Sequence, residues 1–73
     1  MGLTDRAKAL GARIKALRDR HAALDAQIGE IHSRPLPDTV QLRRLKVRKL
    51  RLRDEIRTLE GIVRTLARGP RPA

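Results

Sequence analysis

Three polar side chains interrupt the apolar pattern of this chain at positions where proton or metal chemistry is conceivable. His21 and Asp25 are four residues apart, about one helical turn, and Lys49 stands within a second apolar segment. An imidazole beside a carboxylate can exchange a proton, respond to pH or bind a metal. His32 follows His21 by eleven residues, about 16 Å along a helix, so the two histidines cannot share a metal within one chain. The sequence has no cysteine either, and we predict no catalytic, cofactor or metal site.

The same three residues fit a structural role better. A polar residue in a helix–helix seam lowers stability but can fix register or partner number. We predict that Asp25 pairs with Lys49, and that His21, Asp25 and Lys49 together set the register of two helices. The alternative is that the Lys49 stem lies along Leu24 and its ammonium reaches water.

A second group of residues has the chemistry of an anion-binding surface. Seven of the eleven residues 43–53 are basic. Six of them are candidate polyanion contacts: Arg43, Arg44, Lys46, Arg48, Arg51 and Arg53. At about 100° per residue these charges surround a helix, so they favour contact with a phosphate backbone or acidic surface over base-specific readout. The other interpretation is a solvated coiled-coil exterior.

The composition of the chain limits the functions in which these residues can take part. The chain has 73 residues, 18 Lys and Arg against 8 Asp and Glu, a formal charge of +10, and no aromatic residue. A domain this small with an aliphatic core is marginal alone, which favours a homo-oligomer, a dimer above all, or a protein partner. Nucleic acid is a further candidate partner. No apolar run approaches the ~20 residues of a membrane span, so we expect a cytoplasmic protein that is not transmembrane.

Two apolar stripes define the elements that position these groups. Both stripes alternate three- and four-residue steps, which keeps one narrow seam on one side of a helix. The predicted core residues are Leu10, Ile14, Leu17, Leu24, Ile28, Ile31, Leu42, Leu45, Leu52, Ile56, Leu59 and Val63.

A proline-rich break separates the stripes. Pro35 and Pro37 cannot lie inside a continuous helix. We predict one domain made of helix 3–32, loop 33–37, helix 38–68 and a disordered tail 69–73. Thr4 can cap the first helix. At the start of the second helix, we expect the Asp38 carboxylate to accept a hydrogen bond from the Gln41 amide. The short loop makes the helices antiparallel. The fold class is therefore all-α, a coiled-coil-like helical hairpin, and dimerisation predicts a four-helix bundle.

Two further rows lie away from the seam. On the first helix they are small: Ala9, Ala12, Ala16, Ala23 and Ala26. These alanines either let another helix approach closely or simply favour an exposed helix. On the second helix the row is Val40, Val47 and Leu50, which we interpret as a second contact surface.

Two segments resemble a known family. His21–Ile28 is similar to an H-x-x-L-D-x-x-I element, and Leu45–Ile56 to an L-K-x-x-K-L-x-L-K-D-E-I element in which Arg53 replaces a lysine. Both elements belong to the YdcH-like family of small bacterial proteins, and the resemblance spans about residues 14–60. It implies a short helical hairpin of uncharacterised function, with no catalytic residues to carry over.

The expected function is non-enzymatic. We predict a small basic interaction or scaffold module that self-associates or docks on an anionic partner. The alternatives are a sequence-nonspecific nucleic-acid-binding protein, associated with the nucleoid or the ribosome, and an accessory subunit of a larger assembly.

Overall fold

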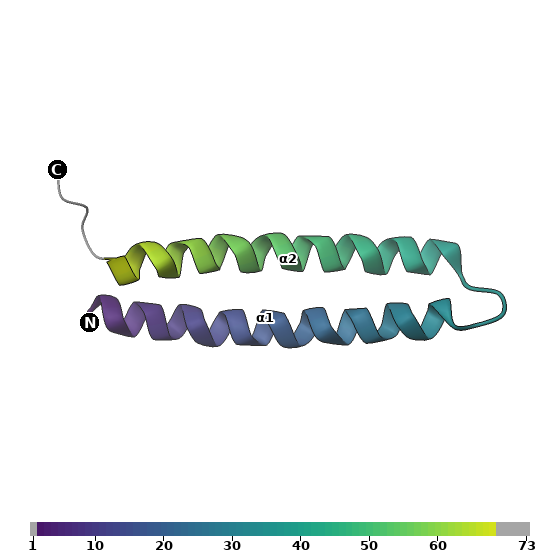
Figure 1. Ribbon diagram of the computed structural model, residues 1–73, viewed down its shortest axis with the longest axis horizontal. Helices are drawn as coiled ribbons and strands as arrows, with labels where there is room; N and C mark the ends of the chain where they lie inside the picture. Colours follow the sequence, from purple (N-terminus) through teal and green to yellow (C-terminus); the bar gives the residue numbers. More distant parts are fainter. Residues whose placement is uncertain (1, 69–73) are drawn as a thin grey trace.

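Two long helices make up the part of the chain that the structure describes, residues 2–68. In this computed structural model, α1 spans Leu3–His32 and α2 spans Thr39–Arg68, and each has 30 residues. The helices lie antiparallel and side by side, joined by one loop (Figure 1). The chain is therefore an all-α helical hairpin, as predicted, and the predicted tail 69–73 lies outside the described residues.

The first helix ends where proline forbids its continuation. The Ser33 amide donates to the Gly29 carbonyl at 3.1 Å, which closes the last turn of α1. Arg34 then precedes Pro35, and a residue before proline is driven out of the helical region. At the other end, Gly2 occupies the N-cap position of α1. Thr4, predicted as the cap, lies within the first turn instead.

The second helix begins with a side-chain cap. The Asp38 carboxylate accepts a hydrogen bond from the Gln41 amide at 3.0 Å, and the Asp38 carbonyl accepts from the Leu42 amide at 3.0 Å. The first of these bonds is the predicted capping interaction, and such caps contribute about 1 kcal/mol. Because Asp38 is the cap, α2 starts at Thr39, one residue later than predicted.

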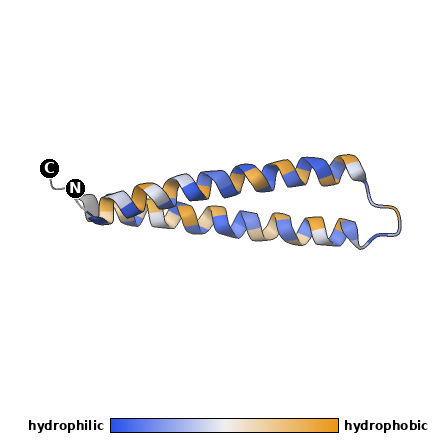
Figure 2. Ribbon diagram, turned by 45° about the horizontal axis from the view of Figure 1, so that its top comes forward, coloured by the Kyte–Doolittle hydropathy of each residue, from blue (hydrophilic) through white to orange (hydrophobic). Residues whose placement is uncertain are grey.

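The contact between the helices is apolar and narrow. Among the residues whose burial the structure describes, six side chains are buried: Leu17, Ile28, Ile31, Leu42, Leu45 and Ile56. Four of these, nearest the loop, form one cluster against which Leu24 packs. Because a single partner helix covers just one side of each apolar stripe, the remaining predicted core positions are only half-buried. They are Leu10, Ile14, Leu24, Leu52, Leu59 and Val63. Figure 2 shows apolar and polar residues alternating along both helices.

The hairpin is long and thin. Its extents are 58 × 22 × 14 Å and its radius of gyration is 16.9 Å, against about 11 Å for a compact domain of this length. No polar or charged side chain is buried among the described residues. Any binding group therefore lies at the surface, in the shallow grooves that flank the helix–helix contact.

Candidate interaction surface

An ion pair joins the two helices in the half of the molecule nearer the loop. Lys49 of α2 contacts the carboxylate of Asp25 on α1. The Lys49 ammonium donates to that carboxylate and places a positive charge beside it, and so holds the pKa of Asp25 below its ordinary value of 3.8. The predicted pair is thus present, and a register role for it stays a prediction.

His21 lies next to this pair without joining it. Its Nδ1 is 3.8 Å from Asp25 Oδ2, too far for a hydrogen bond. Its Nε2 is buried and has no hydrogen-bond partner among the described residues. In residues 2–68 no group of three His, Asp or Glu side chains is arranged to hold a metal ion. Packing therefore positions the imidazole, and the described geometry supplies it with no proton relay.

Ion pairs close one flank of the helix contact. Arg18 pairs with Glu60, and Asp25 pairs with Lys49. Arg18 and Asp25 are seven residues apart on α1, so they share one side of that helix. We call this side the paired flank. A third cross-helix pair, Arg13–Glu55 at 2.7 Å, lies on the other side, toward the chain termini.

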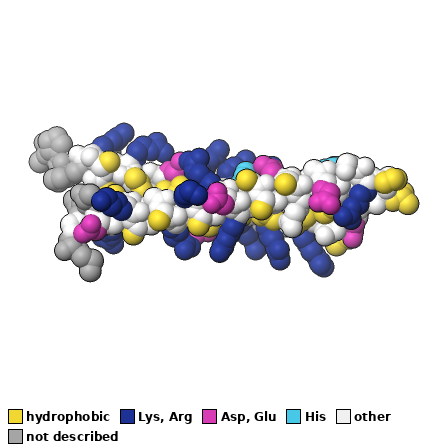
Figure 3. Space-filling model, turned by 90° about the horizontal axis from the view of Figure 1, so that it is seen from below, with side chains coloured by type: hydrophobic (Ala, Val, Ile, Leu, Met, Phe, Trp, Pro, Cys, Tyr) yellow, Lys and Arg dark blue, Asp and Glu magenta, His cyan; other side chains and the backbone are white. Residues whose placement is uncertain are grey.

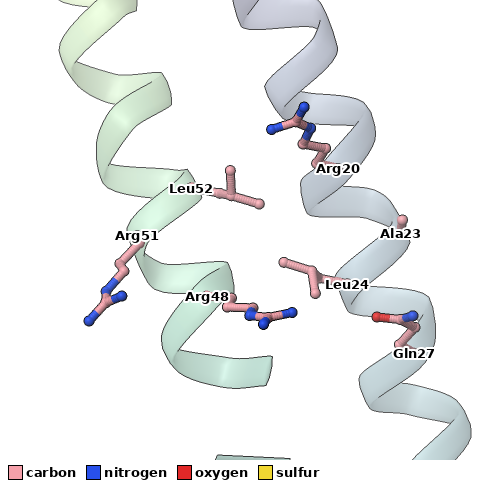
Figure 4. A pocket seen from close by; sticks show the side chains of 7 residues that line it. All are labelled: Arg20, Ala23, Leu24, Gln27, Arg48, Arg51 and Leu52. Atoms are coloured by element: carbon pink, nitrogen blue, oxygen red, sulfur yellow. The ribbon is translucent and has the colours of Figure 1, made fainter. Parts of the chain in front are cut away.

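The other flank opens into a groove beside that third pair. Figure 4 shows Leu24 and Leu52 pointing toward one another from the two helices, with Arg20 and Arg48 extending across the space between. We call this the open groove. It is lined by Arg20, Ala23, Leu24, Gln27, Arg48, Arg51 and Leu52, and toward the loop by Glu30, Ile31, Arg34, Gln41 and Leu45. Gln27 and Arg48 line both parts, so the two parts adjoin.

The structure spreads the basic run over several surfaces. All six predicted polyanion contacts are exposed: Arg43, Arg44, Lys46, Arg48, Arg51 and Arg53. Arg48 and Arg51 line the open groove, whereas Arg53 lies in a hollow beside His21. None of the six takes part in an ion pair between described residues. Lys and Arg side chains accordingly project along both long edges of the molecule (Figure 3).

The apolar row of α2 is left uncovered. Val40, Val47 and Leu50 are 60%, 41% and 47% exposed. Val47 and Leu50 line a hollow together with Arg43 and Lys46. Their role as a second contact surface stays a prediction.

Sequence reasoning missed the open groove. Arg20, Ala23 and Gln27 recur at three- and four-residue steps on α1, which places them on one side of that helix. That spacing was the available signal. The spacing does not reveal that Arg48 of α2 lies across the groove from these residues, because that position depends on how both helices are rotated about their axes.

Comparison with known proteins gives one match. A family model described as "Protein of unknown function (DUF465)" matches residues 14–60, which is more than half of the chain. These residues include the loop, the Asp25–Lys49 pair and the open groove. No curated protein and no solved structure matches the chain. Within residues 2–68, neither helix has the length and apolarity needed to cross a bilayer.

Proposed function

The chain belongs to the DUF465 family, which includes the YdcH-like small bacterial proteins, and we propose that it is a non-enzymatic interaction module that docks on an anionic partner. The basic run of α2, residues 43–53, is the docking surface. The observation that carries this proposal is that six exposed cations of the run have no ion-pair partner among the described residues.

Four acidic residues are already engaged and do not compensate these six cations. Asp25, Glu55 and Glu60 pair across the two helices, and Asp38 caps α2. Among the described residues, six of the run's seven cations therefore keep an unpaired charge, since only Lys49 contacts a carboxylate. Neighbouring cations on one helix repel each other, and a partner that supplies carboxylates or phosphates relieves this repulsion.

The exposed surface also favours a partner. The chain exposes 6125 Å², whereas a compact monomer of 8.3 kDa exposes about 4,600 Å². The excess, roughly 1,500 Å², is about twice the ~800 Å² that one partner contributes to a standard protein–protein interface. A homodimer would cover the same kind of area, and self-association stays a prediction from the sequence.

The hydroxyl groups support a non-enzymatic role. Three of them donate to backbone carbonyls of their own helical segments: Ser33 to Glu30 at 2.7 Å, Thr58 to Asp54 at 3.0 Å and Thr65 to Gly61 at 3.0 Å. A hydroxyl held in this way lacks the adjacent general base that an activated nucleophile requires.

Binding to two labelled polyanions tests the proposal. We would titrate the full chain against an acidic polypeptide, poly-glutamate, and against a mixed-sequence DNA duplex at about 0.15 M salt. The key variant is Arg43→Gln, Arg44→Gln, Lys46→Gln. It should weaken binding of the tighter probe by about tenfold or more. The probe that binds more tightly identifies the partner as acidic protein or nucleic acid.

A matched variant separates the basic run from net charge. Lys8→Gln, Arg64→Gln, Arg68→Gln removes three exposed cations outside the run. It should leave affinity within about threefold of the unmodified chain. An equal loss in both variants would show that only net charge acts, and failure of both probes to bind at this salt would end the proposal.

A further inference from the structure

We infer that the open groove is the docking site for an acidic amphipathic helix of a protein partner, which lies between α1 and α2 as the third helix of a bundle. This inference rests on the proposed function and names the partner of that part of the basic run, Arg48 and Arg51, that lines the open groove. It commits to protein rather than nucleic acid.

The floor of the groove is apolar. Leu24 and Leu52 point toward one another there and are only half-buried, whereas toward the loop the groove is more polar, with the buried Ile31 and Leu45 beneath it. A groove between two helices accepts a third helix whose apolar residues recur at three- and four-residue steps. A nucleic-acid backbone offers no apolar surface to match this floor.

The rims of the groove are positive on both sides. Arg20 and Arg34 come from α1, and Arg48 and Arg51 from α2, against the single acidic residue Glu30. A partner helix with glutamates or aspartates on both edges of its apolar stripe would pair with cations from both helices at once. Guanidinium groups suit this because they bind carboxylates through two parallel hydrogen bonds.

A small side chain permits close approach. Ala23 is exposed at the rim of the groove. Ala9 and Ala16 precede it at seven-residue spacing and are exposed too. Small residues on this side leave room for a third helix axis at the 8–10 Å typical of packed helices.

The other candidate occupants and the other flank fit less well. A second copy docked groove to groove would bring its own arginines against Arg20 and Arg48. On the paired flank, Glu60 and Asp25 pair with Arg18 and Lys49, which leaves two arginines of the hollow on that flank without an ion pair between described residues, against four in the open groove. Charge complementarity therefore directs an acidic helix to the open groove.

A synthetic helix tests the groove directly. The probe is a labelled peptide of Glu, Ala and Leu with leucines at heptad spacing. Its control is a peptide of identical composition with the leucines scattered around the helix. We expect the full chain to bind the amphipathic peptide at least about tenfold more tightly than the scattered one. Equal affinity for both peptides would overturn the groove as the docking site, because binding would then depend on charge alone.

Two alanine positions make a matched pair of variants. Ala23→Gln places a longer side chain at the rim of the groove, whereas Ala26→Gln makes the same change three residues away, at an exposed position outside the groove lining. We expect Ala23→Gln to weaken binding of the amphipathic peptide about tenfold and Ala26→Gln to leave it unchanged. Circular dichroism of both variants verifies that the helices are retained.

The outcomes separate this inference from the proposed function. One outcome is that the peptides bind, that the triple variant Arg43→Gln, Arg44→Gln, Lys46→Gln binds them more weakly, and that Ala23→Gln has no effect. In that case the groove is not the docking site, and the proposed function stands. If neither peptide nor poly-glutamate nor duplex DNA binds, both are wrong. Tighter binding of DNA than of the amphipathic peptide, or dimerisation that Ala23→Gln abolishes in sedimentation equilibrium, would also overturn the groove as a site for an acidic helix.

Discussion

The half of the hairpin next to the loop and the half next to the termini are held together by different interactions. Near the loop, Ile28, Ile31, Leu42 and Leu45 form a buried aliphatic cluster. Toward the termini only Leu17 and Ile56 of the described seam residues are buried, the positions beyond them are half-buried, and Arg13–Glu55 and Arg18–Glu60 join the helices at the surface. Buried aliphatic groups contribute far more to stability than exposed ion pairs do. The two halves therefore have similar helices but unequal stability.

The difference in stability between the two halves bears on the proposed docking site. The open groove begins near the middle of the molecule and extends over the buried cluster, since Ile31 and Leu45 belong to both. The proposed docking site thus lies on the more stable half. Because buried contacts hold the helices of this half, we expect a partner to order mainly the arginine side chains of the groove and little of its backbone.

Truncating one core residue in each half gives the largest expected effect. Ile28→Ala should lower the free energy of unfolding by about 2–5 kcal/mol, because it removes a buried side chain and leaves a cavity. Leu59→Ala removes a half-buried side chain and should cost less than half as much. Denaturant unfolding followed by circular dichroism measures both at one protein concentration. Equal losses would mean that the two halves are equally well packed.

Removing the cap of α2 should have the next largest effect. Asp38→Ala deprives the Gln41 amide of its acceptor, and the expected loss is about 1 kcal/mol. Asp54→Ala makes the same charge change at an exposed site in the middle of α2 and should cost much less. Thermal unfolding of the two variants provides the comparison, and similar melting temperatures would contradict a capping role.

The Asp25–Lys49 pair predicts a pH-dependent contribution. Lys49 lowers the pKa of Asp25 in the folded state, so the pair stabilises the hairpin at pH values above the ordinary Asp pKa of 3.8. This stabilisation is lost as the pH falls through the lower, folded-state pKa. Asp25→Asn should therefore be less stable than the unmodified chain at neutral pH, and the difference should disappear in strong acid. Unfolding curves across this pH range measure it, and a difference that persists in strong acid would show another cause.

The exposed pair near the termini should contribute least. Arg13 and Glu55 are largely solvent-accessible, and such pairs contribute about 0.2–1 kcal/mol. Glu55→Gln should reduce stability by this amount at low salt, and the loss should vanish near 1 M salt, where charges are screened within about 3 Å. Unfolding at two salt concentrations tests this, and a salt-independent loss would point to packing instead.

The sequence was sufficient for the features that depend on local spacing. The two stripes and Pro35–Pro37 predict the hairpin, and the cap at Asp38 follows from its position before the second stripe. The Asp25–Lys49 contact also follows, because antiparallel pairing about a short loop brings these two positions together.

Features that depend on helix rotation could not be predicted in this way. Heptad spacing identifies the seam but not which long side chains reach across its flanks. Arg13–Glu55 and Arg18–Glu60 therefore went unpredicted, as did the groove between Arg20 and Arg48. Burial was overestimated for Leu10 and Val63, because a single partner helix cannot enclose every seam position.

The position of the buried cluster beside the loop also sets the order of folding. Ile31 and Leu42, both in the cluster, are separated by eleven positions, whereas Arg13 and Glu55 are separated by 42. Closing a short segment costs less chain entropy than closing a long one. We therefore expect the first contacts between the nascent helices to form at the turn, and pairing to spread outward from there.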